Sequence, residues 1–528
     1  MADGSRAARP QVTIWLSHEY AAKSARAAYG RLPHALLPLG FRRLWEAQSE
    51  RLGAHGEGAI IALPDDHRLD EWDVRRFAAE GLDVRTFPRA LSPGRVLMEI
   101  FASAALPAGP IRFLQGDLPA VGLETERLDL VTVGRQRSAA WGALPDPTSP
   151  GGQGRHLAGY ASLSDSREFA RLLAKLGGDL AGALAAYGAR TPLTRQDVAP
   201  DGAAEGARSR SVVGGRGFLA RGFNDVKIDQ GGVRKTSGHV AKLMAEAQWL
   251  KRVPPRLQPF CAKVLDEGGC ADGYSYVTEY RSLPTLAELY LFGRLERAAW
   301  SRILDGCKTF MDEARAAAGD CRPVDALGRL AIDKTHARLE EFERKTAFGI
   351  HAGNRLNGRP APSLTHCAET AARLIRGAEA RPAIMHGDFC FTNILYDTDA
   401  DRILLIDPRG SIDDRSPTLC GDGVYDAAKL MHSIAGGYDL ILAGRFDGVF
   451  SGHDLQFDMP RSRRQAWLSR LGADVCAGGV AWGSPTVAAV VVTLFLSMLP
   501  LHEDDPIRQR AFIANALRLH RELDRMSD

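Results

Sequence analysis

The sequence predicts an α/β domain with a mainly parallel sheet, followed by an α+β domain built from two lobes. Three observations predict this order: strand-like and helix-like runs alternate at first, a polar linker interrupts them, and a β-rich stretch then gives way to helices. At 528 residues the chain is also too long for one compact core, so two or three domains are expected. We divide it into residues 1–205, a small β-rich lobe at 206–282 and a large helical lobe at 283–528.

The first domain is defined by short apolar runs separated by helix-patterned stretches. Strands are predicted at residues 12–16, 59–63, 82–87, 110–117 and 129–134. Helices are predicted at residues 41–54, 70–81 and 166–188. Strands that alternate with helices indicate a mainly parallel sheet covered on both faces. The polar, Gly- and Ala-rich residues 194–211 are predicted to be a linker, with the domain boundary near residue 205.

A different pattern follows the linker. Residues 212–237 predict two or three antiparallel strands with glycine turns, and an amphipathic helix over 239–253 stops at Pro254-Pro255. Residues 262–280 predict a hairpin. The remainder is mostly helical, except for the stretch around residues 384–410.

Composition narrows the class of protein. The net charge is +3, close to balance, which argues against a nucleic-acid or anionic-membrane partner. The longest apolar run, residues 488–500, is too short to span a bilayer and predicts a buried helix. The first residues carry no signal-peptide pattern, so a cytoplasmic location is expected. The eight cysteines form no CxxC pair and predict free core thiols rather than a metal site or disulfides.

The candidate chemistry lies in residues 384–410, where Asp388, Asn393 and Asp407 stand among apolar residues. Residues 394–396 and 402–406 predict a hairpin, with Asn393 just before its first strand and Asp407 just after its second. The two ends of a hairpin are adjacent, and opposed side chains lie about 5 Å apart. An amide oxygen and a carboxylate at that separation suit Mg²⁺, which leaves Asp388 to act as a base toward a hydroxyl. This division of roles is the one that phosphoryl transfer needs.

The spacing of these residues resembles the aminoglycoside phosphotransferase and choline kinase superfamily. The loop 386–393 has the form D-x-x-x-x-N and begins H-G-D rather than the H-R-D of protein kinases, and Asp407 ends the next hairpin. The resemblance implies a bilobal protein-kinase-like fold and ATP- and Mg²⁺-dependent phosphotransfer to an alcohol group. Gly387 replaces the arginine that holds a phosphorylated activation loop in protein kinases, which favours a small-molecule acceptor.

The same resemblance assigns ATP-binding roles upstream. Gly215 and Gly217 lie in a glycine-rich stretch that can approach phosphates, although it is not a clean GxGxxG and is weak alone. Lys235 would contact the α- and β-phosphates, and Glu246 on the next helix would hold it. Taken singly, these two would more often be a surface lysine and a solvated helix residue. Glu279 lies where a hinge would bind adenine through its backbone.

Downstream, residues 420–439 resemble the G-D-x-x-Y-D-x-A-K stretch of the superfamily. By this resemblance Asp426 would brace the catalytic loop, with a plain helix N-cap as the alternative. Arg409 would reach a phosphate or pair with an acidic residue, and His502 would be structural or bind the acceptor. Further acceptor candidates in the helical lobe are Asp413, Asp414 and Arg415.

The first domain resembles the sugar-phosphate nucleotidyltransferases. Residues 30–52 are similar to their L-P-K-x-L-x-P-I-x-G-x-P-x-L stretch, residues 113–119 to their strand-end Asp motif with Asp117 as metal-ligand candidate, and residues 159–165 to a later stretch. The resemblance implies a Rossmann-like nucleotidyltransferase fold. However, the glycine loop expected after residue 16 is absent, and His34 replaces the motif's lysine. We therefore expect lost nucleotidyl transfer, with sugar-nucleotide binding or a silent scaffold remaining.

The two resemblances together are typical of bacterial capsule and surface-polysaccharide biosynthesis. They imply a sugar or polyol as the acceptor and glycan-biosynthesis enzymes as partners. Two alternatives stay open: a non-catalytic two-domain scaffold in glycan assembly, and a bifunctional nucleotidyltransferase–kinase, which the missing glycines disfavour.

Overall fold

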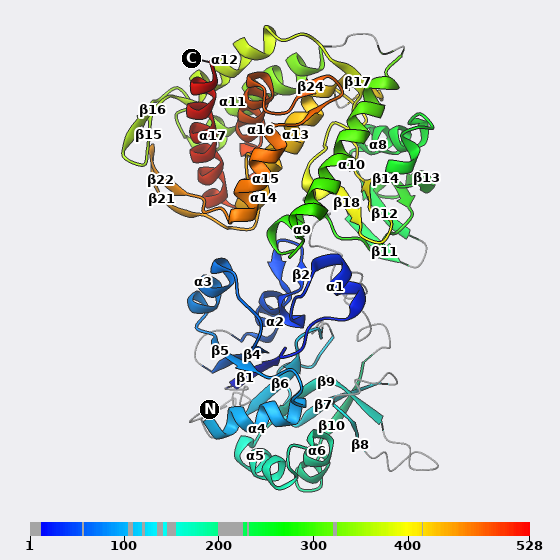
Figure 1. The fold of residues 1–528 in the computed structure, drawn as a ribbon, viewed down its shortest axis with the longest axis vertical. Coiled ribbons are helices and arrows are strands. Elements are labelled where there is room, and N and C mark those ends of the chain that lie inside the picture. Colours follow the sequence, from blue (N-terminus) through cyan, green and yellow to red (C-terminus); the bar gives the residue numbers. More distant parts are fainter. Residues whose placement is uncertain are drawn as a thin grey trace, which may run out of the picture. The chain divides into compact units, whose positions relative to one another are not determined.

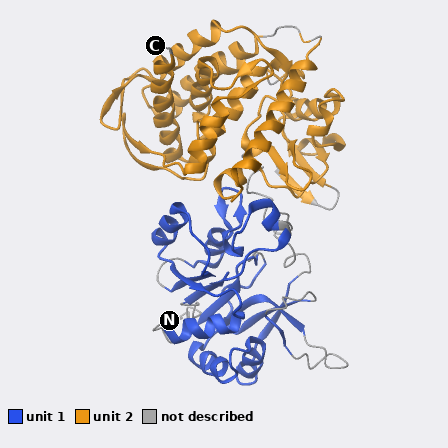
Figure 2. Ribbon diagram, viewed as in Figure 1, with its two compact units in different colours: residues 1–217 blue, residues 218–528 orange. Residues whose placement is uncertain are grey.

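The structure is a computed structural model, and it forms two compact units, residues 1–217 and 218–528 (Figure 2). The boundary predicted near residue 205 lies in the same stretch of chain, 199–224, which is outside the described residues. The residues that the structure describes are 12–54, 58–103, 109–118, 122–134, 141–144, 155–198, 225–229, 232–319, 321, 325–413 and 415–527.

Unit 1 is built on a mixed eight-stranded sheet of order β10-β7-β9-β6-β1-β4-β5, with β8 paired to β9 (Figure 1). Its strands are β1 (Val12–Leu16), β4 (Ala59–Pro64), β5 (Asp83–Phe87), β6 (Ile111–Gln115), β7 (Leu130–Gly134), β8 (Ala143–Leu144), β9 (Arg155–Leu163) and β10 (Thr194–Asp197). Strands β6, β1, β4 and β5 run parallel, as does β10 with β7, whereas β9 is antiparallel to both β6 and β7. The five predicted strands of this domain are confirmed.

The predicted linker starts too early in the sequence. Residues Thr194–Asp197 form β10, which extends the sheet at its edge by parallel pairing with β7. None of these four residues is apolar, and none is fully buried. An edge strand needs no hydrophobic face on its open side, so its sequence looks like that of a linker.

Helices cover both faces of the sheet in unit 1. They are α1 (Lys23–Tyr29), α2 (Leu44–Leu52), α3 (Glu71–Ala79), α4 (Pro93–Ser103), α5 (Ser166–Lys175) and α6 (Leu180–Gly188), with the short helix η1 (His34–Leu36) and the small hairpin β2 (Pro38–Leu39) and β3 (Arg42–Arg43). Successive residues of β1 point to opposite faces: Ile14 joins the core cluster under α5 and α6, and Trp15 joins the one with Trp45 of α2. The predicted two-sided covering is therefore confirmed.

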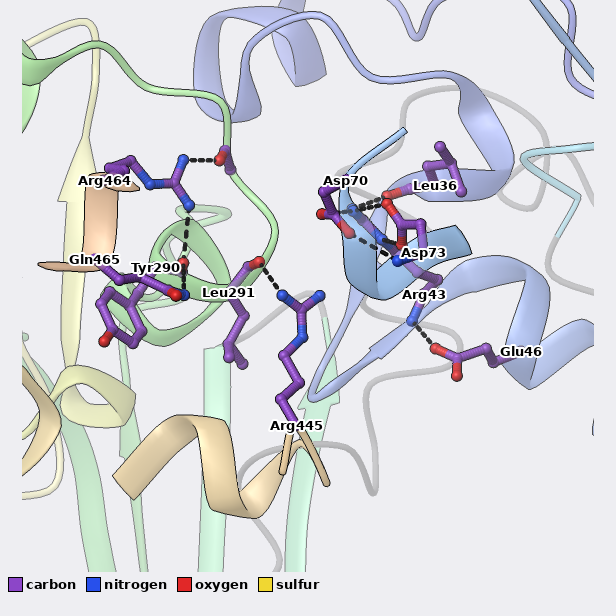
Figure 3. Close-up of polar contacts among 11 residues, drawn as sticks. Leu36, Arg43, Glu46, Asp70, Asp73, Tyr290, Leu291, Arg445, Arg464 and Gln465 are labelled. Atoms are coloured by element: carbon purple, nitrogen blue, oxygen red, sulfur yellow. Dashed lines mark hydrogen bonds and ion pairs between the residues drawn. The ribbon is translucent and has the colours of Figure 1, made fainter. Parts of the chain in front are cut away.

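A buried arginine holds the segment between η1 and α3 in place (Figure 3). The Arg43 side chain is 2% exposed and donates to both carboxylate oxygens of Asp73, over 2.9 and 2.6 Å, and to the carbonyl of Leu36 over 2.6 Å. Its backbone N–H donates to the side chain of Glu46, one bond of the capping box that starts α2. The bidentate pair fixes the guanidinium on α3, and its bond to Leu36 ties η1, which carries His34, to that helix.

Unit 2 begins with a small lobe made of one antiparallel sheet and one helix. The sheet has the order β11-β12-β14-β13, and its strands are β11 (Asp225–Asp229), β12 (Gly232–Ser237), β13 (Val264–Cys270) and β14 (Gly273–Thr278). Helix α8 (Val240–Arg252) follows β12 and ends before Pro254, as predicted. The predicted hairpin is β13–β14, and the glycine-rich residues 212–224 lie outside the described residues.

The large lobe is mostly helical, as predicted. Its helices are α9 (Leu286–Leu291), α10 (Arg297–Ala316), α11 (Lys334–Thr346), α12 (Leu364–Arg376), α13 (Gly423–Ile434), α14 (Tyr438–Leu442), α15 (Arg463–Ala473), α16 (Pro485–Ser497) and α17 (Pro506–Ser527), with the shorter helices η4 (Gly328–Asp333), η5 (Phe391–Asn393) and η6 (Leu499–His502). The short helix η3 (Gln258–Phe260) lies between α8 and β13 of the small lobe. Helix α16 contains most of the apolar run 488–500 and packs against α11, α12, α13 and α17 (Figure 1). Among the described residues, no helix combines the length and the apolar character that a membrane crossing requires.

Short strands complete this lobe. They are β15 (Asn354–Leu356), β16 (Arg359–Ala361), β17 (Pro382–Ile384), β18 (Ile394–Asp397), β19 (Arg402–Leu405), β20 (Cys420–Asp422), β21 (Asp447–Ser451), β22 (Asp454–Asp458), β23 (Cys476–Ala477) and β24 (Val480–Ala481). The predicted hairpin at residues 394–406 is β18–β19, and β17 pairs with β20. A four-stranded sheet of order β16-β15-β22-β21 was not predicted.

The end of α9 is held by arginines from a later part of the lobe (Figure 3). Arg445 donates to the carbonyl of Leu291 and Arg464 to that of Tyr290, both over 2.9 Å, and Arg464 also donates to the carbonyl of Gly293. The carbonyls of Tyr290 and Leu291 lie in the last turn of α9, at the negative end of its dipole. The guanidinium groups therefore cap α9 and tie it to the segment around α14 and α15.

The cysteine prediction is wrong at one pair. Cys321 and Cys420 form a disulfide, while the other six cysteines are free. The two partners are 99 residues apart in sequence, and no local pattern marks them. The bond connects the segment after α10 to β20, the strand that pairs with β17 just before the candidate catalytic loop.

Candidate active site

A buried lysine joins the two lobes of unit 2. Lys235 on β12 places its Nζ 2.6 Å from Oε2 of Glu246 on α8 and 3.3 Å from Oδ2 of Asp407, which follows β19. Burial alone would lower the pKa of Lys235, but the carboxylates of Asp407 and Glu246 outweigh it and raise that pKa well above its ordinary value. Lys235 is therefore a fixed cation between two carboxylates.

A cleft opens beside this lysine. It is lined by Val226, Val233, Lys235, Leu250, Ala262, Tyr276, Thr278, Ile406 and Asp407. The lining is largely apolar, with one cation and one anion. Such walls suit a flat aromatic base, and the charged pair suits the phosphates and metal of a nucleotide.

The backbone around Asp407 is unusual and closely packed. Asp407 has a φ of +56°, a conformation that non-glycine residues rarely adopt and that is concentrated at functional sites. Three residues on, Gly410 has a φ of +68°, and a Cβ there would overlap the carbonyl of Ala245 and lie 2.8 Å from the nitrogen of Glu246. The segment that presents Asp407 thus rests directly on the helix that presents Glu246.

The loop between β17 and η5 carries the predicted base. Asn393 Nδ2 donates to Oδ2 of Asp388 over 2.8 Å and to its backbone carbonyl over 3.0 Å. Lys429 Nζ lies 2.8 Å from the other carboxylate oxygen, Oδ1. The Asp388 side chain is 24% exposed, so solvent still reaches the carboxylate. An acceptor hydroxyl can therefore approach a base whose orientation is fixed from both sides.

The hairpin brings Asn393 and the Asp407 segment together. Ile394 pairs with Leu405 in the β18–β19 ladder, and the N–H of Ile406 donates to the carbonyl of Asn393 over 3.0 Å. Within the described residues, no set of three His, Cys, Asp or Glu side chains is arranged to hold a metal. Asn393 and Asp407 offer an amide oxygen and a carboxylate, and such a sparse oxygen set fits Mg²⁺, which keeps water and phosphate as its remaining ligands.

Helix α13 braces the candidate catalytic loop, residues 386–393, through Asp426. Its two carboxylate oxygens accept the N–H groups of His386 over 2.8 Å and Gly387 over 2.7 Å. Burial raises the pKa of Asp426 to about 7, although the two N–H groups act in the opposite direction. The N-cap of α13 is Asp422, which accepts from the N–H of Val424. The bracing role predicted for Asp426 is confirmed, and the N-cap alternative is wrong.

His386 is a structural member of the same loop. It is fully buried, its Nε2 lies 3.1 Å from the carbonyl of Ile406, and its Nδ1 accepts the N–H of Asp388 over 3.3 Å. Burial lowers the pKa of His386 to about 4, so the ring is neutral at physiological pH. A neutral ring with its proton on Nε2 satisfies both contacts and joins the base to the hairpin.

The backbone conformation gives a second explanation for a glycine at position 387, besides the one inferred from the sequence. Its φ is +76°, and a Cβ at this position would lie 2.7 Å from the Cβ of Arg409. An arginine here would therefore be strained and would collide with the segment after Asp407. The preference for a small-molecule acceptor stays a prediction.

Sequence reasoning assigned no role to Lys429, although it is the lysine of the stretch that resembles G-D-x-x-Y-D-x-A-K. Its signal was present, because it lies three residues after Asp426 on the same helix, and residues so spaced share a face. Only the fold shows that this face meets the catalytic loop.

The remaining candidates fall into three groups. Gly215, Gly217 and Asp414 lie outside the described residues. Glu279 is engaged within the small lobe, because its N–H donates to the Lys263 carbonyl and its carboxylate accepts from Arg281; an adenine contact stays a prediction. Asp413 accepts the N–H groups of Arg415 and Ser416 in a local turn. The N–H of Arg409 donates to the carbonyl of His386. His502 is buried against the ring of Phe512.

The candidate metal ligand of unit 1 stands at the end of a central strand. Asp117 follows β6, and its carboxylate lies 3.2 Å from Nδ1 of His34. Burial would lower the pKa of His34, but Asp117 outweighs it and raises that pKa. The segment after β1, in which the sequence lacks the glycine-rich loop of the family it resembles, contains helix α1 at residues 23–29. His34 thus contacts the predicted metal ligand through Nδ1. The expected loss of nucleotidyl transfer by this unit stays a prediction.

Comparison with known proteins gives two groups of solved structures. No protein-family model matches the chain, and no curated protein gives a significant match. Aminoglycoside 2'-phosphotransferase-IIIa in its GDP complex is 14% identical, covering 58% of this chain and 91% of its own, with a TM-score of 0.32. Plasmodium vivax ethanolamine kinase is 8% identical, covering 57% and 84%, with a TM-score of 0.32. The CTP:phosphocholine cytidylyltransferase of Streptococcus pneumoniae is 13% identical, covering 36% and 91%, with a TM-score of 0.26.

Proposed function

We propose that unit 2 is an ATP- and Mg²⁺-dependent kinase that transfers a phosphoryl group to a hydroxyl of a small molecule. The observation that carries the proposal is the joint placement of two groups of side chains. Lys235, Glu246 and Asp407 form a charged cluster beside an apolar cleft, and Asp388 and Asn393 stand on the loop that the same hairpin supports.

Each group has a role that follows from its chemistry. Lys235, oriented by Glu246, would bind the phosphates of ATP. Asp407 and Asn393 would hold Mg²⁺, which neutralises phosphate charge when bound. Asp388 would accept the proton of the acceptor hydroxyl as it attacks the γ-phosphorus. The apolar cleft wall beside Lys235 would receive the adenine.

We propose a sugar or polyol as the acceptor, with surface-glycan synthesis as the setting. The support is the order of the sequence motifs, in which a nucleotidyltransferase-like domain precedes the kinase motifs. The experiment is a phosphate-transfer screen of the full chain over sugars, polyols, choline and aminoglycosides. Transfer to aminoglycosides alone would contradict the glycan setting and leave the kinase proposal standing.

The kinase proposal is tested most directly at Asp388. Asp388→Asn keeps the shape of the side chain but removes the base, so we expect turnover to fall by about 10³-fold or more, while calorimetry still detects Mg²⁺-dependent ATP binding. Wild-type turnover in Asp388→Asn would overturn the assignment of the base. A full chain that binds no ATP in the presence of Mg²⁺ would favour the scaffold alternative instead.

The proposed loss of nucleotidyl transfer in unit 1 has its own test. The full chain is incubated with one nucleotide (CTP, UTP or GTP) together with sugar 1-phosphates, and the release of pyrophosphate is measured. We expect none above background, and robust release would restore the bifunctional alternative.

A further inference from the structure

Helix α13 turns one polar face toward the catalytic loop. Asp426, Lys429 and Ser433 have the spacing i, i+3 and i+7, which places them on one side of a helix. Asp426 accepts two backbone N–H groups of the loop, and Ser433 Oγ accepts the N–H of Phe391 over 3.2 Å. Lys429 differs from both, because it contacts the side chain of the predicted base itself.

The contacts of Lys429 with Asp388 are those of an internal ion pair. Its Nζ lies 2.8 Å from Oδ1, and the lysine side chain is 13% exposed against 24% for the aspartate. The second oxygen, Oδ2, accepts from Asn393 over 2.8 Å. Burial would lower the pKa of Lys429, but the Asp388 carboxylate outweighs it, and the pKa of the ammonium is raised. A charged lysine and an amide therefore hold the two carboxylate oxygens separately, which fixes the plane of the carboxylate.

We propose that Lys429 is a positioning residue for phosphoryl transfer that acts through Asp388. This inference rests on the proposed kinase function. In the transfer, the acceptor oxygen bonds to the γ-phosphorus, and its proton passes to Asp388. The bond from that phosphorus to the β,γ-bridging oxygen breaks, and its electron pair leaves with ADP. Lys429 holds the Asp388 carboxylate where it meets the acceptor proton.

The geometry favours action through the base over direct contact with the transferred phosphate. The ammonium is already engaged by Asp388 and is the more buried partner of the pair. Without it, one carboxylate oxygen loses its charge-assisted bond, and the side chain can turn about its terminal torsion, which has broad preferences. A misplacement of about 1 Å at a reacting group costs about 10²-fold in rate.

The test uses Mg²⁺-ATP with water as the acceptor, because ADP release from slow hydrolysis needs no identified substrate. We expect Lys429→Met to lower the hydrolysis rate about 100-fold, with the affinity for Mg²⁺-ATP unchanged within about threefold by calorimetry. Lys429→Arg should recover part of the rate. Lys308→Met is the matched control and should keep the wild-type rate, since Lys308 likewise pairs with an aspartate, Asp312, but is exposed on α10.

The decisive comparison is the double variant. Because Lys429 acts through Asp388, adding Lys429→Met to Asp388→Asn should cause no further loss beyond about twofold. A multiplicative loss would place Lys429 on the phosphate and overturn the proposal, as would a wild-type rate in Lys429→Met alone. Should Lys429→Met not fold, as judged by thermal unfolding, the same comparison is made with Lys429→Arg in both backgrounds. A wild-type chain that neither binds nor hydrolyses Mg²⁺-ATP would refute the kinase function, and the positioning role with it.

Discussion

The contact of Gly410 with α8 gives a test of how the two lobes of unit 2 are coupled. Gly410 has a φ of +68°, and a Cβ would overlap the Ala245 carbonyl. In Gly410→Ala, the helix and the loop must separate by about 1 Å to restore normal contact distances. Lys235 Nζ and Glu246 Oε2 are 2.6 Å apart, so a shift of that size is enough to take the pair outside hydrogen-bond range.

Two costs combine in this variant, and a control separates them. The left-handed backbone costs alanine about 1–2 kcal/mol, and overpacking costs a further 1–3 kcal/mol or so. Gly444 has a φ of +65°, and a Cβ at that position would meet no atom within 4 Å, so Gly444→Ala carries the backbone cost alone. The difference between the two variants in free energy of unfolding therefore measures the contact with α8.

Denaturant unfolding and calorimetric titration with Mg²⁺-ATP provide the two readouts. We expect Gly410→Ala to lie about 1–3 kcal/mol below Gly444→Ala in free energy of unfolding, and to bind Mg²⁺-ATP at least about tenfold more weakly. Gly444→Ala should bind Mg²⁺-ATP as the wild type does. If both variants lose equal stability and keep equal affinity, the packing of this loop on α8 does not control the lysine, and the reasoning fails.

Three further predictions concern stability. Burial raises the pKa of Asp426 from 3.8 to about 7, so the proton it binds stabilises the folded state at acidic pH, and this contribution disappears as the pH rises from 4 to 8. Over that range the free energy of unfolding of the wild type should fall by up to about 4 kcal/mol relative to that of Asp426→Asn. A difference between the two proteins that does not change with pH would contradict this prediction. Reduction of the Cys321–Cys420 disulfide, or Cys321→Ser, should lower the free energy of unfolding by about 3–4 kcal/mol, because the bond closes a loop of 99 residues. The control Cys270→Ser, at a free and exposed cysteine, should change it very little. Equal denaturation midpoints with and without reductant would argue against the bond. Arg43→Met leaves a buried carboxylate without its partner and should cost about 3–5 kcal/mol, seen as a lower thermal midpoint; an unchanged midpoint would show that the pair contributes nothing.

The parts of the fold that sequence predicted are those set by local pattern. The β18–β19 hairpin follows from two apolar runs around a polar turn, and its register places Asn393 beside the residue before Asp407. Helix α8 follows from its periodicity and from the prolines after it. In each case the signal and the structure lie within about 20 residues of each other, where local preferences decide the outcome.

The features that sequence missed join residues far apart along the chain. Lys429 reaches Asp388 from a separate helix, and the paired strands β17 and β20 bring the two segments together. The disulfide spans 99 residues, and β15 pairs with β22 across about as many. Such contacts depend on how whole helices and strands pack, and the local pattern of a single sequence does not predict that packing. Strand β10 was missed for a different reason, since its open edge allows a polar sequence.

The two groups of catalytic candidates in unit 2 are supported by different elements, and this separation has a consequence for function. Lys235 and Glu246 stand on β12 and α8 of the small lobe, whereas Asp388 is held by α13, a helix packed against the buried α16. Asp407 connects the groups, because it follows the hairpin next to the candidate catalytic loop and lies 3.3 Å from the lysine. Substitutions on the α8 side should therefore act first on nucleotide affinity, and those on the α13 face on the rate of transfer. A variant of Asp407 should impair both, because that side chain belongs to both groups.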